Sequence, residues 1–307
     1  MLKGCIKINS GLLIIDKPAD ISSARAVSIV KKLTGAKKVG HTGTLDPFAT
    51  GVLPCCINEA TKISRFFLEG NKKYIAKLSL GIETDTQDFT GKVISTSKDL
   101  NFSEEDIIAV FKKYEGSIDQ VPPAYSALKH KGIPLYKYAR KGKTILKPAR
   151  KIDIHYIKPI NINLPEVLFE VSCSAGTYIR TLCADIGKAL GCGGHLSQLK
   201  RIESCGLNIS QALSINILEE IISKEGNISK HLLNMSDALK QIPGYIADDI
   251  LIEKLSHGKL ITERDINLVQ TNKTASFIKI VNNNNDLLAI LNKIGNKFVY
   301  CCVINNN

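Results

Sequence analysis

Apolar side chains recur at every second position over residues 73–80, and this pattern restricts the fold more than any other stretch of the chain. Tyr74, Ala76, Leu78 and Leu80 share one face if the segment is extended, because successive side chains of a strand point to opposite sides. The alternation therefore predicts a half-buried strand. The chain must build a sheet, and residues 12–15, 50–57 and 167–173 are further candidate strands.

Helices are indicated by apolar spacing and by end signals. Ser22 or Ser23 can cap a helix whose apolar positions are Ala26, Val27, Val30 and Leu33, and Gly35 can end it. Residues 179, 182, 186 and 190 form the apolar stripe of a later helix. Between the first helix and the strand at 50–57 we expect a loop over residues 37–47, and residues 59–68 predict a short amphipathic helix.

Positive charge is concentrated in the middle of the chain. The formal net charge is +12, and residues 129–151 contain nine Lys or Arg and no Asp or Glu. The surrounding segment, 121–148, is rich in Pro, Gly and Lys and predicts a long excursion from the core. Tyr136 and Tyr138 lie within it, and basic residues interleaved with aromatic ones suit phosphate contact and base stacking. RNA contact is favoured over a merely solvated loop.

The last part of the chain predicts a second, smaller domain. The sequence Ile-Pro-Gly at 242–244 indicates a boundary, so we expect domains at 1–244 and 245–307. A short helix at 248–256, stopped by Gly258, is followed by apolar runs at 277–281, 287–291 and 298–304. These features predict a small, mostly β domain.

The expected location is the cytoplasm. The N-terminus shows no signal pattern, and no stretch approaches about 18 consecutive apolar residues, so no membrane association is expected. The nine cysteines include two adjacent pairs and no C-x-x-C spacing, which predicts reduced thiols and no metal site.

Three residues suggest chemistry, although each has a simpler interpretation. Asp46 precedes Pro47 in a loop that also contains His41, which can hold the carboxylate out of the loop; it can equally be a turn residue. Arg180 lies in the first turn of its helix, where a cation opposes the helix dipole unless it pairs with an anion; the alternative is an exposed Arg. Tyr74 on the apolar face is either a core residue or part of a site.

The segment 40–54, Gly-His-Thr-Gly-Thr-Leu-Asp-Pro-Phe-Ala-Thr-Gly-Val-Leu-Pro, resembles the catalytic signature of the tRNA pseudouridine synthase B family. Segments of this chain that resemble other parts of the family follow in the same order between about residues 10 and 240: GLLIIDKP at 11–18, Lys73-Tyr74, GIETDTQDFTG at 81–91, QVPPAYSAL at 120–128, GTYIR at 176–180, 185–187 and 195–201. Residues 255–259 and the short strands resemble the family's PUA domain.

The resemblance implies an α+β pseudouridine synthase fold, with a central, mostly antiparallel sheet flanked by helices and loops and a small, mostly β, PUA-like C-terminal domain. It implies isomerisation of uridine 55 in the T-arm of tRNA, by a monomer that needs no cofactor and no metal. An insertion at about 120–151 would grip the T-arm stem-loop. The basic residues expected to contact RNA there are Lys129, Lys131, Arg140 and Lys141.

The resemblance also assigns roles to single residues. Asp46 is the catalytic carboxylate, acting either as a nucleophile or as a base at C2′. Arg180 pairs with Asp46, and Tyr74 lies against the base and takes part in proton transfer from C5. Leu199 and Tyr178 line the substrate site. His41 helps to extract the base from its stack.

Other functions remain open at this stage. A guide-dependent pseudouridine synthase would work inside a ribonucleoprotein, but the insertion at 120–151 and the lack of long charged tails favour a stand-alone enzyme. A non-catalytic RNA-binding protein or tRNA chaperone would not need Asp46, Tyr74 and Arg180 together. A DNA-binding protein would show a helix-turn-helix or zinc-finger pattern, which is not visible here.

Overall fold

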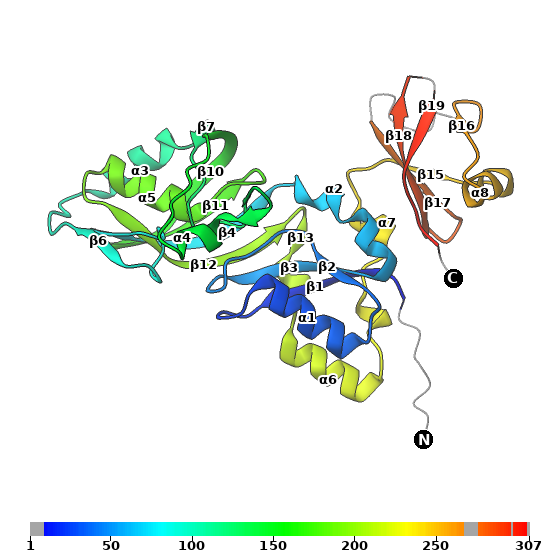
Figure 1. Ribbon diagram of the computed structural model, residues 1–307, viewed down its shortest axis with the longest axis horizontal. Helices are drawn as coiled ribbons and strands as arrows, with labels where there is room; N and C mark the ends of the chain where they lie inside the picture. Colours follow the sequence, from blue (N-terminus) through cyan, green and yellow to red (C-terminus); the bar gives the residue numbers. More distant parts are fainter. Residues whose placement is uncertain (1–8, 267–275, 296, 306–307) are drawn as a thin grey trace.

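Among the described residues, the chain forms a ten-stranded sheet with helices on it, a five-stranded sheet and two separate two-stranded hairpins (Figure 1). The structure is a computed structural model that describes residues 9–266, 276–295 and 297–305. Helices and strands are both present throughout, which confirms the α+β class. Among the described residues, no helix is both long enough and apolar enough to span a membrane.

The large sheet has ten strands in the order β14-β1-β3-β12-β4-β11-β10-β7, with β2 beside β3 and β13 beside β12. All neighbouring pairs are antiparallel except β1 with β14 and β3 with β12. The predicted, mostly antiparallel sheet is therefore confirmed. Its strands are β1 Gly11–Lys17, β2 Val39–His41, β3 Thr50–Ile57, β4 Lys72–Leu80, β7 Gly116–Gln120, β10 Arg150–Asn163, β11 Glu166–Cys173, β12 Gly194–Ser204, β13 Leu207–Asn208 and β14 Leu213–Ser214.

Burial explains why the strands could be recognised in the sequence. Strand β4 alternates between buried and half-exposed residues, as predicted, because one face packs on the core below α3 (Glu104–Lys113) and α5 (Ile179–Ala189). Strand β1 is continuously apolar because both of its faces are covered. Leu13 and Ile15 pack with α1 (Ser23–Thr34) and α6 (Ile215–Glu225), whereas Leu12 and Ile14 face the opposite core.

The first predicted helix is confirmed at both ends. The Ser22 side chain accepts a hydrogen bond from the backbone N–H of Arg25, and Gly35 ends α1 in the left-handed region with a φ of 66°. The predicted loop at 37–47 contains a short strand, β2, that pairs with β3.

The single helix predicted at 59–68 is wrong. Residues Asn58–Ile63 form a 3-10 helix, and α2 covers only Arg65–Leu68. The hydroxyls of Thr61 and Ser64 donate to carbonyls three residues earlier, at 2.7 and 2.9 Å, and so favour the tighter turns.

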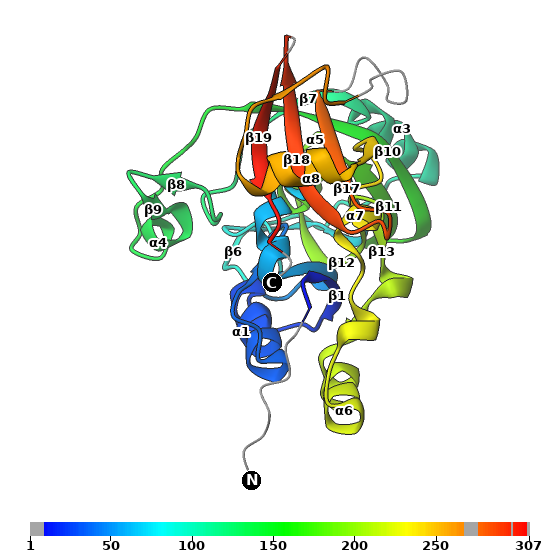
Figure 2. The same cartoon turned by 90° about the vertical axis from the view of Figure 1, so that its right-hand side faces the viewer.

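The basic insertion projects from the body, as Figure 2 shows. It contains β8 Lys129–His130, β9 Ile133–Pro134 and the short helix α4 Leu135–Ala139. A separate hairpin of β5 Ile82–Thr84 and β6 Val93–Thr96 follows β4. Short elements complete the first part of the chain, namely the 3-10 turns Ile209–Gln211 and Ser229–His231 and helix α7 Met235–Ala238.

The second sheet forms a separate, mostly β domain at the C-terminal end, as predicted. Its order is β15-β17-β18-β19-β16, with bounds Gly244–Ile246, Phe277–Val281, Leu287–Ile294, Lys297–Val303 and Ile261–Thr262, and helix α8 covers Asp249–Ser256. It has its own core. Leu287, Ile290 and Ile304 pack in one cluster with Leu12 and Met235, which joins the two domains.

Candidate active site

Asp46 lies in the loop between β2 and β3, and this loop is held from two sides. The Ser23 hydroxyl donates to the Leu45 carbonyl at 3.0 Å and accepts from the Leu45 N–H at 2.8 Å. The fully buried Lys17 donates through Nζ to the Pro47 carbonyl at 3.0 Å. The backbone on either side of Asp46 is thus fixed by the first helix and the first strand.

Arg180 is buried, with 3% of its surface exposed, so the interpretation as an exposed helix residue is wrong. Its Nε lies 2.9 Å from Asp46 Oδ2, and its Nη2 donates to Asp46 Oδ1 at 3.3 Å. On its other edge, Nη1 lies 3.4 Å from Asp88 Oδ2. The ion pair with Asp46 that the resemblance implies is present, and it accounts for a cation in the first turn of a helix.

Two effects compete at the Asp46 carboxyl. Burial and the Asp88 charge both raise its pKa, and burial contributes most. The Arg180 charge lowers the pKa, and the net result lies above the ordinary value. About a third of the side chain, 33%, remains exposed toward the pocket. Arg180 thus fixes the orientation of the carboxylate, while part of the carboxylate stays accessible to a ligand.

Tyr74 and Leu199 line a pocket of about 540 Å³ together with Asp46 and Arg180. Tyr74 comes from β4 and Leu199 from the adjacent strand β12, and each residue is 8% exposed. Burial raises the pKa of Tyr74 to about 12, so its hydroxyl is protonated at neutral pH. The structure therefore brings together the four residues on which the predicted chemistry depends.

Tyr178 lines the same pocket and is clamped from behind. Its backbone N–H donates to Gln120 Oε1 at 2.8 Å, and its carbonyl accepts from Gln120 Nε2 at 3.1 Å. The Arg150 guanidinium lies 5.0 Å from the centre of its ring. The position of Tyr178 immediately before α5 is thereby fixed.

His41 lines a second hollow, of about 690 Å³, that Asp46 and Arg180 also line. Its Nδ1 accepts a hydrogen bond from the Gly43 N–H at 3.3 Å. Burial lowers the pKa of its imidazole, and the charge of Arg201 lowers it further. A neutral His41 at the edge of the site is consistent with a shape-filling residue.

The four basic residues predicted to contact RNA are divided by the structure. Arg140 lines the second hollow with His41 and Asp46, and its guanidinium lies 5.5 Å from the Tyr136 ring centre. Lys129, Lys131 and Lys141 are exposed on the insertion and do not line either hollow beside Asp46. They form an outer basic surface.

Sequence reasoning missed several charged residues of the site. Lys72 and Arg201 line the pocket, Asp88 contacts Arg180 and Lys17 contacts Pro47, and all four residues are buried. A signal was available for Lys17, which lies two residues after the apolar run of the predicted strand at 12–15, where a buried charge is rare without a partner or a function.

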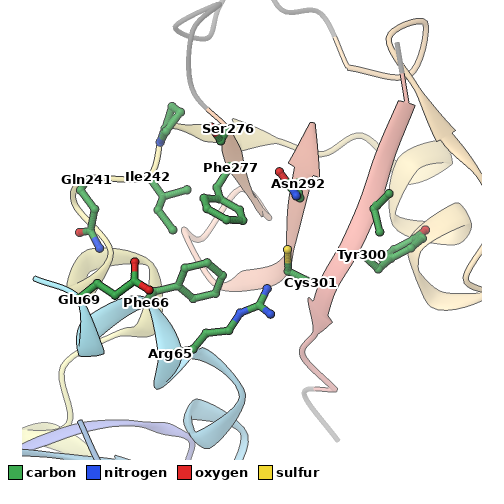
Figure 3. Close-up of a pocket in the computed structure, with 12 residues that line it drawn as sticks. Arg65, Phe66, Glu69, Gln241, Ile242, Ser276, Phe277, Asn292, Tyr300 and Cys301 are labelled. Carbon is green, nitrogen blue, oxygen red and sulfur yellow. The ribbon is translucent and has the colours of Figure 1, made fainter. Parts of the chain in front are cut away.

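A larger hollow of about 720 Å³ lies elsewhere, at the junction of the two domains (Figure 3). Phe66 from α2 and Phe277 from β17 meet there edge to face, with ring centres 5.3 Å apart. None of the predicted site residues lines it. In the described ranges, no group of three or more His, Cys, Asp or Glu side chains is placed to hold a metal ion.

Comparison with known protein families gives two adjacent matches. Residues 31–179 match the TruB family pseudouridylate synthase N-terminal domain, and residues 180–240 match the tRNA pseudouridylate synthase B C-terminal domain. The chain is 46% identical over 222 residues to tRNA pseudouridine synthase B of Francisella tularensis, covering 72% of this chain and 73% of that protein. It is 40% identical over 249 residues to the protein of the same name from Syntrophotalea carbinolica, covering 81% of each.

Solved structures share the fold over nearly the whole chain. A chain in the crystal structure of a Cbf5-Nop10-Gar1 complex matches with a TM-score of 0.75 at 27% identity, covering 96% of this chain and 85% of that one. A chain in the structure of an H/ACA RNP bound to a substrate RNA matches with a TM-score of 0.74 at 24% identity, with the same coverage.

Proposed function

This chain belongs to the TruB family of tRNA pseudouridine synthases, and from that membership and the geometry of the site we propose that it isomerises uridine 55 in the T-arm of tRNA, with Asp46 as the catalytic carboxylate. The single observation that carries the proposal is the ion pair between Arg180 and Asp46 at 2.9 Å, on the wall of a pocket that Tyr74 and Leu199 also line.

The reaction needs an ionised carboxylate in a fixed direction. Pseudouridine formation breaks the bond between N1 and C1′, turns the uracil, and rejoins it to the sugar through C5. Whether Asp46 attacks as a nucleophile or removes the proton from C2′, it acts through an unprotonated oxygen. Arg180 favours that form and contacts both oxygens, while the pocket leaves a third of the side chain open to substrate.

The pocket suits a base that has left its stack. Reaching Asp46 requires the target nucleotide to unstack, at a cost of a few kcal/mol. The rings of Tyr74 and Tyr178 and the side chain of Leu199 offer an apolar lining for the uracil. The protonated Tyr74 hydroxyl can take part in proton transfer from C5, and His41 at the loop's edge would help to keep the base out of its stack.

The basic insertion would hold the T-arm, and the C-terminal domain, as a PUA-like module, would contact the acceptor side. The enzyme would act as a cytoplasmic monomer without cofactor or metal. The solved structures with the same fold come from a Cbf5-Nop10-Gar1 complex and an H/ACA RNP, but the relatives at 40–46% identity are named tRNA pseudouridine synthase B, which supports a stand-alone enzyme.

The test is tritium release from tRNA transcripts labelled at C5 of uridine, with purified protein and no guide RNA. Wild type should release one tritium per tRNA, and a transcript with cytidine at position 55 should release none. Asp46→Asn should lower the rate by on the order of 10²–10⁴-fold or more. Asp99→Asn, at an exposed position, is the matched control and should retain wild-type activity.

Three results would contradict the proposal. An inactive wild type that gains activity with an added guide RNA would identify a guide-dependent enzyme. A wild type that binds tRNA without any release would identify a binding protein. Full activity in Asp46→Asn would remove Asp46 from the chemistry.

A further inference from the structure

Arg201 is one of the largest fully buried side chains of the protein, with 1% of its surface exposed. It lies on β12 at the point where this strand joins the two halves of the large sheet. Its backbone is opposite Gly51 of β3 on one side and Tyr74 of β4 on the other. The side chain reaches the wall of the pocket that Asp46 lines.

The Arg201 guanidinium connects the catalytic loop to the sheet. Its Nε donates to the Val52 carbonyl at 2.7 Å, and its Nη2 donates to the Gly43 carbonyl at 3.0 Å. Gly43 is three residues before Asp46. Gly51, with a φ of +100°, lets the backbones approach closely, since a Cβ there would lie 2.2 Å from the Arg201 carbonyl oxygen.

Among the described residues, the charge of Arg201 has no carboxylate partner. Within the part of the chain that the structure describes, it donates to the two backbone carbonyls and interacts with the Tyr74 hydroxyl, and no Asp or Glu forms an ion pair with it. The charged residues near it are Lys17 and Lys72, and the Arg201 charge helps to lower the pKa of both lysines and of His41. A buried cation without an anionic partner is costly, so it indicates a site for an anion.

The pocket as a whole has the same imbalance. Among its described lining residues, the cations are Lys72, Arg150, Arg180 and Arg201, and the one carboxylate is Asp46, which Arg180 already neutralises. On the side of Tyr74, the pocket therefore carries unmatched positive charge.

We infer that Arg201 is a positioning residue for the proposed reaction. Its side chain fixes the loop of Asp46 through Gly43, and it holds a positive charge beside the uracil while that base is detached as an anion. This inference rests on the proposed function. When the N1–C1′ bond breaks, its electron pair stays on the base and spreads over N1 and the two carbonyl oxygens. The negative charge disappears when C5 bonds to C1′, C5 releases its proton and N1 takes one up.

Three substitutions separate the two parts of this role. Arg201→Lys keeps the charge but loses the forked donor, Arg201→Gln keeps an N–H donor but loses the charge, and Arg201→Met loses both. Lys279→Met is the matched control, because the Lys279 ammonium also donates to two backbone carbonyls, those of Ser236 and Leu239, but at the second sheet.

The decisive measurement is the single-turnover rate with enzyme in excess over tRNA, together with tRNA affinity and melting temperature. We expect Arg201→Met to lose about 10²-fold in rate while its tRNA Kd stays within about threefold. Arg201→Lys should be faster than Arg201→Gln, and Lys279→Met should keep the wild-type rate. A rate for Arg201→Met within about threefold of wild type would overturn the inference, and Arg201→Gln matching or exceeding Arg201→Lys would overturn the role of the charge.

Hydrogen exchange provides a readout that does not depend on activity. Amides of residues 42–49 should exchange faster in Arg201→Met than in Lys279→Met, because the loop loses its link to β12. Unchanged exchange there would overturn the positioning role. If wild type releases no tritium from tRNA, the proposed function fails, but the exchange result still decides whether Arg201 holds the loop.

Discussion

At the scale of the single residue, the chemistry depends on how Arg180 distributes its charge. It contacts Asp46 on one edge and Asp88 on the other, and it also donates to the carbonyls of Thr86 and Tyr125 at 3.0 and 2.7 Å. Asp88 is buried and accepts hydrogen bonds from Thr86 and Thr90. Arg180 is therefore held rigidly, and Asp46 experiences both its positive charge and the negative charge of Asp88.

The substitution Asp88→Asn should move the acid limb of the pH–rate profile to lower pH. Burial raises the pKa of Asp46 and the Asp88 charge raises it further, so the active, ionised form is lost as pH falls through a raised pKa. Removing the Asp88 charge lowers that pKa, and ionised Asp46 then persists to lower pH. Single-turnover rates measured from about pH 4.5 to 8 test this, with Asp99→Asn as control; an acid limb that stays in place or moves upward would contradict it.

At the scale of the element, the N-terminus of α5 is positioned by β7 and not by a cap of its own. Tyr178 at the N-cap position makes no side-chain capping hydrogen bond. Gln120, at the end of β7, bonds both backbone groups of Tyr178. Because Arg180 follows two residues later, Gln120 holds the start of the basic insertion and the helix that carries Arg180 in one place.

Gln120→Ala should therefore lower both stability and rate. It leaves the N–H of Tyr178 without a partner, while the carbonyl keeps only the helical hydrogen bond from the Leu182 N–H, at a cost of about 1–3 kcal/mol in the free energy of unfolding. The single-turnover rate should fall more than tRNA affinity, since Arg180 is displaced. Urea unfolding and single-turnover assays test this, and Gln211→Ala, which removes an exposed cap, is the control. Equal effects of the two variants would show that Gln120 does not position α5.

At the scale of the whole molecule, the positive charge and the projecting insertion of the protein suit a polyanionic ligand. The net charge is +12, and the insertion, which projects from the body (Figure 2), carries exposed basic side chains. Arg140 lies where this surface meets the second hollow beside Asp46. The RNA backbone could thus be held outside while one nucleotide enters the site.

Reversing three charges of the insertion should weaken tRNA binding and reduce its dependence on salt. In a variant with Lys129→Glu, Lys131→Glu and Lys141→Glu, the slope of log K against log salt should decrease by about 0.7–0.9 for each phosphate that the protein no longer neutralises. The control reverses Lys37, Lys224 and Lys230, which are also exposed. Binding isotherms at several salt concentrations test this, and similar effects of both variants would mean that only total charge matters.

The sequence by itself determined the local elements, because their signals lie within a few residues of each other. The alternation around Tyr74 predicted β4, the caps at Ser22 and Gly35 predicted α1, and the loop before Pro47 presented Asp46 as a candidate. Family resemblance added the order of the segments and the pairing of Arg180 with Asp46. The helix at 59–68 was wrong, since hydroxyls of Thr61 and Ser64 compete locally with regular helical bonds.

Only the tertiary structure decided how these elements form a site. The placement of β12 between β3 and β4 joins residues more than a hundred positions apart and puts Arg201 beside both Gly43 and Tyr74. The tertiary structure also divides the predicted basic residues, because Arg140 lines the site whereas Lys129, Lys131 and Lys141 lie outside it. Periodicity reports whether a residue faces a core, but which strands pair across that core depends on long-range packing, and so the burial of Arg201 could not be foreseen.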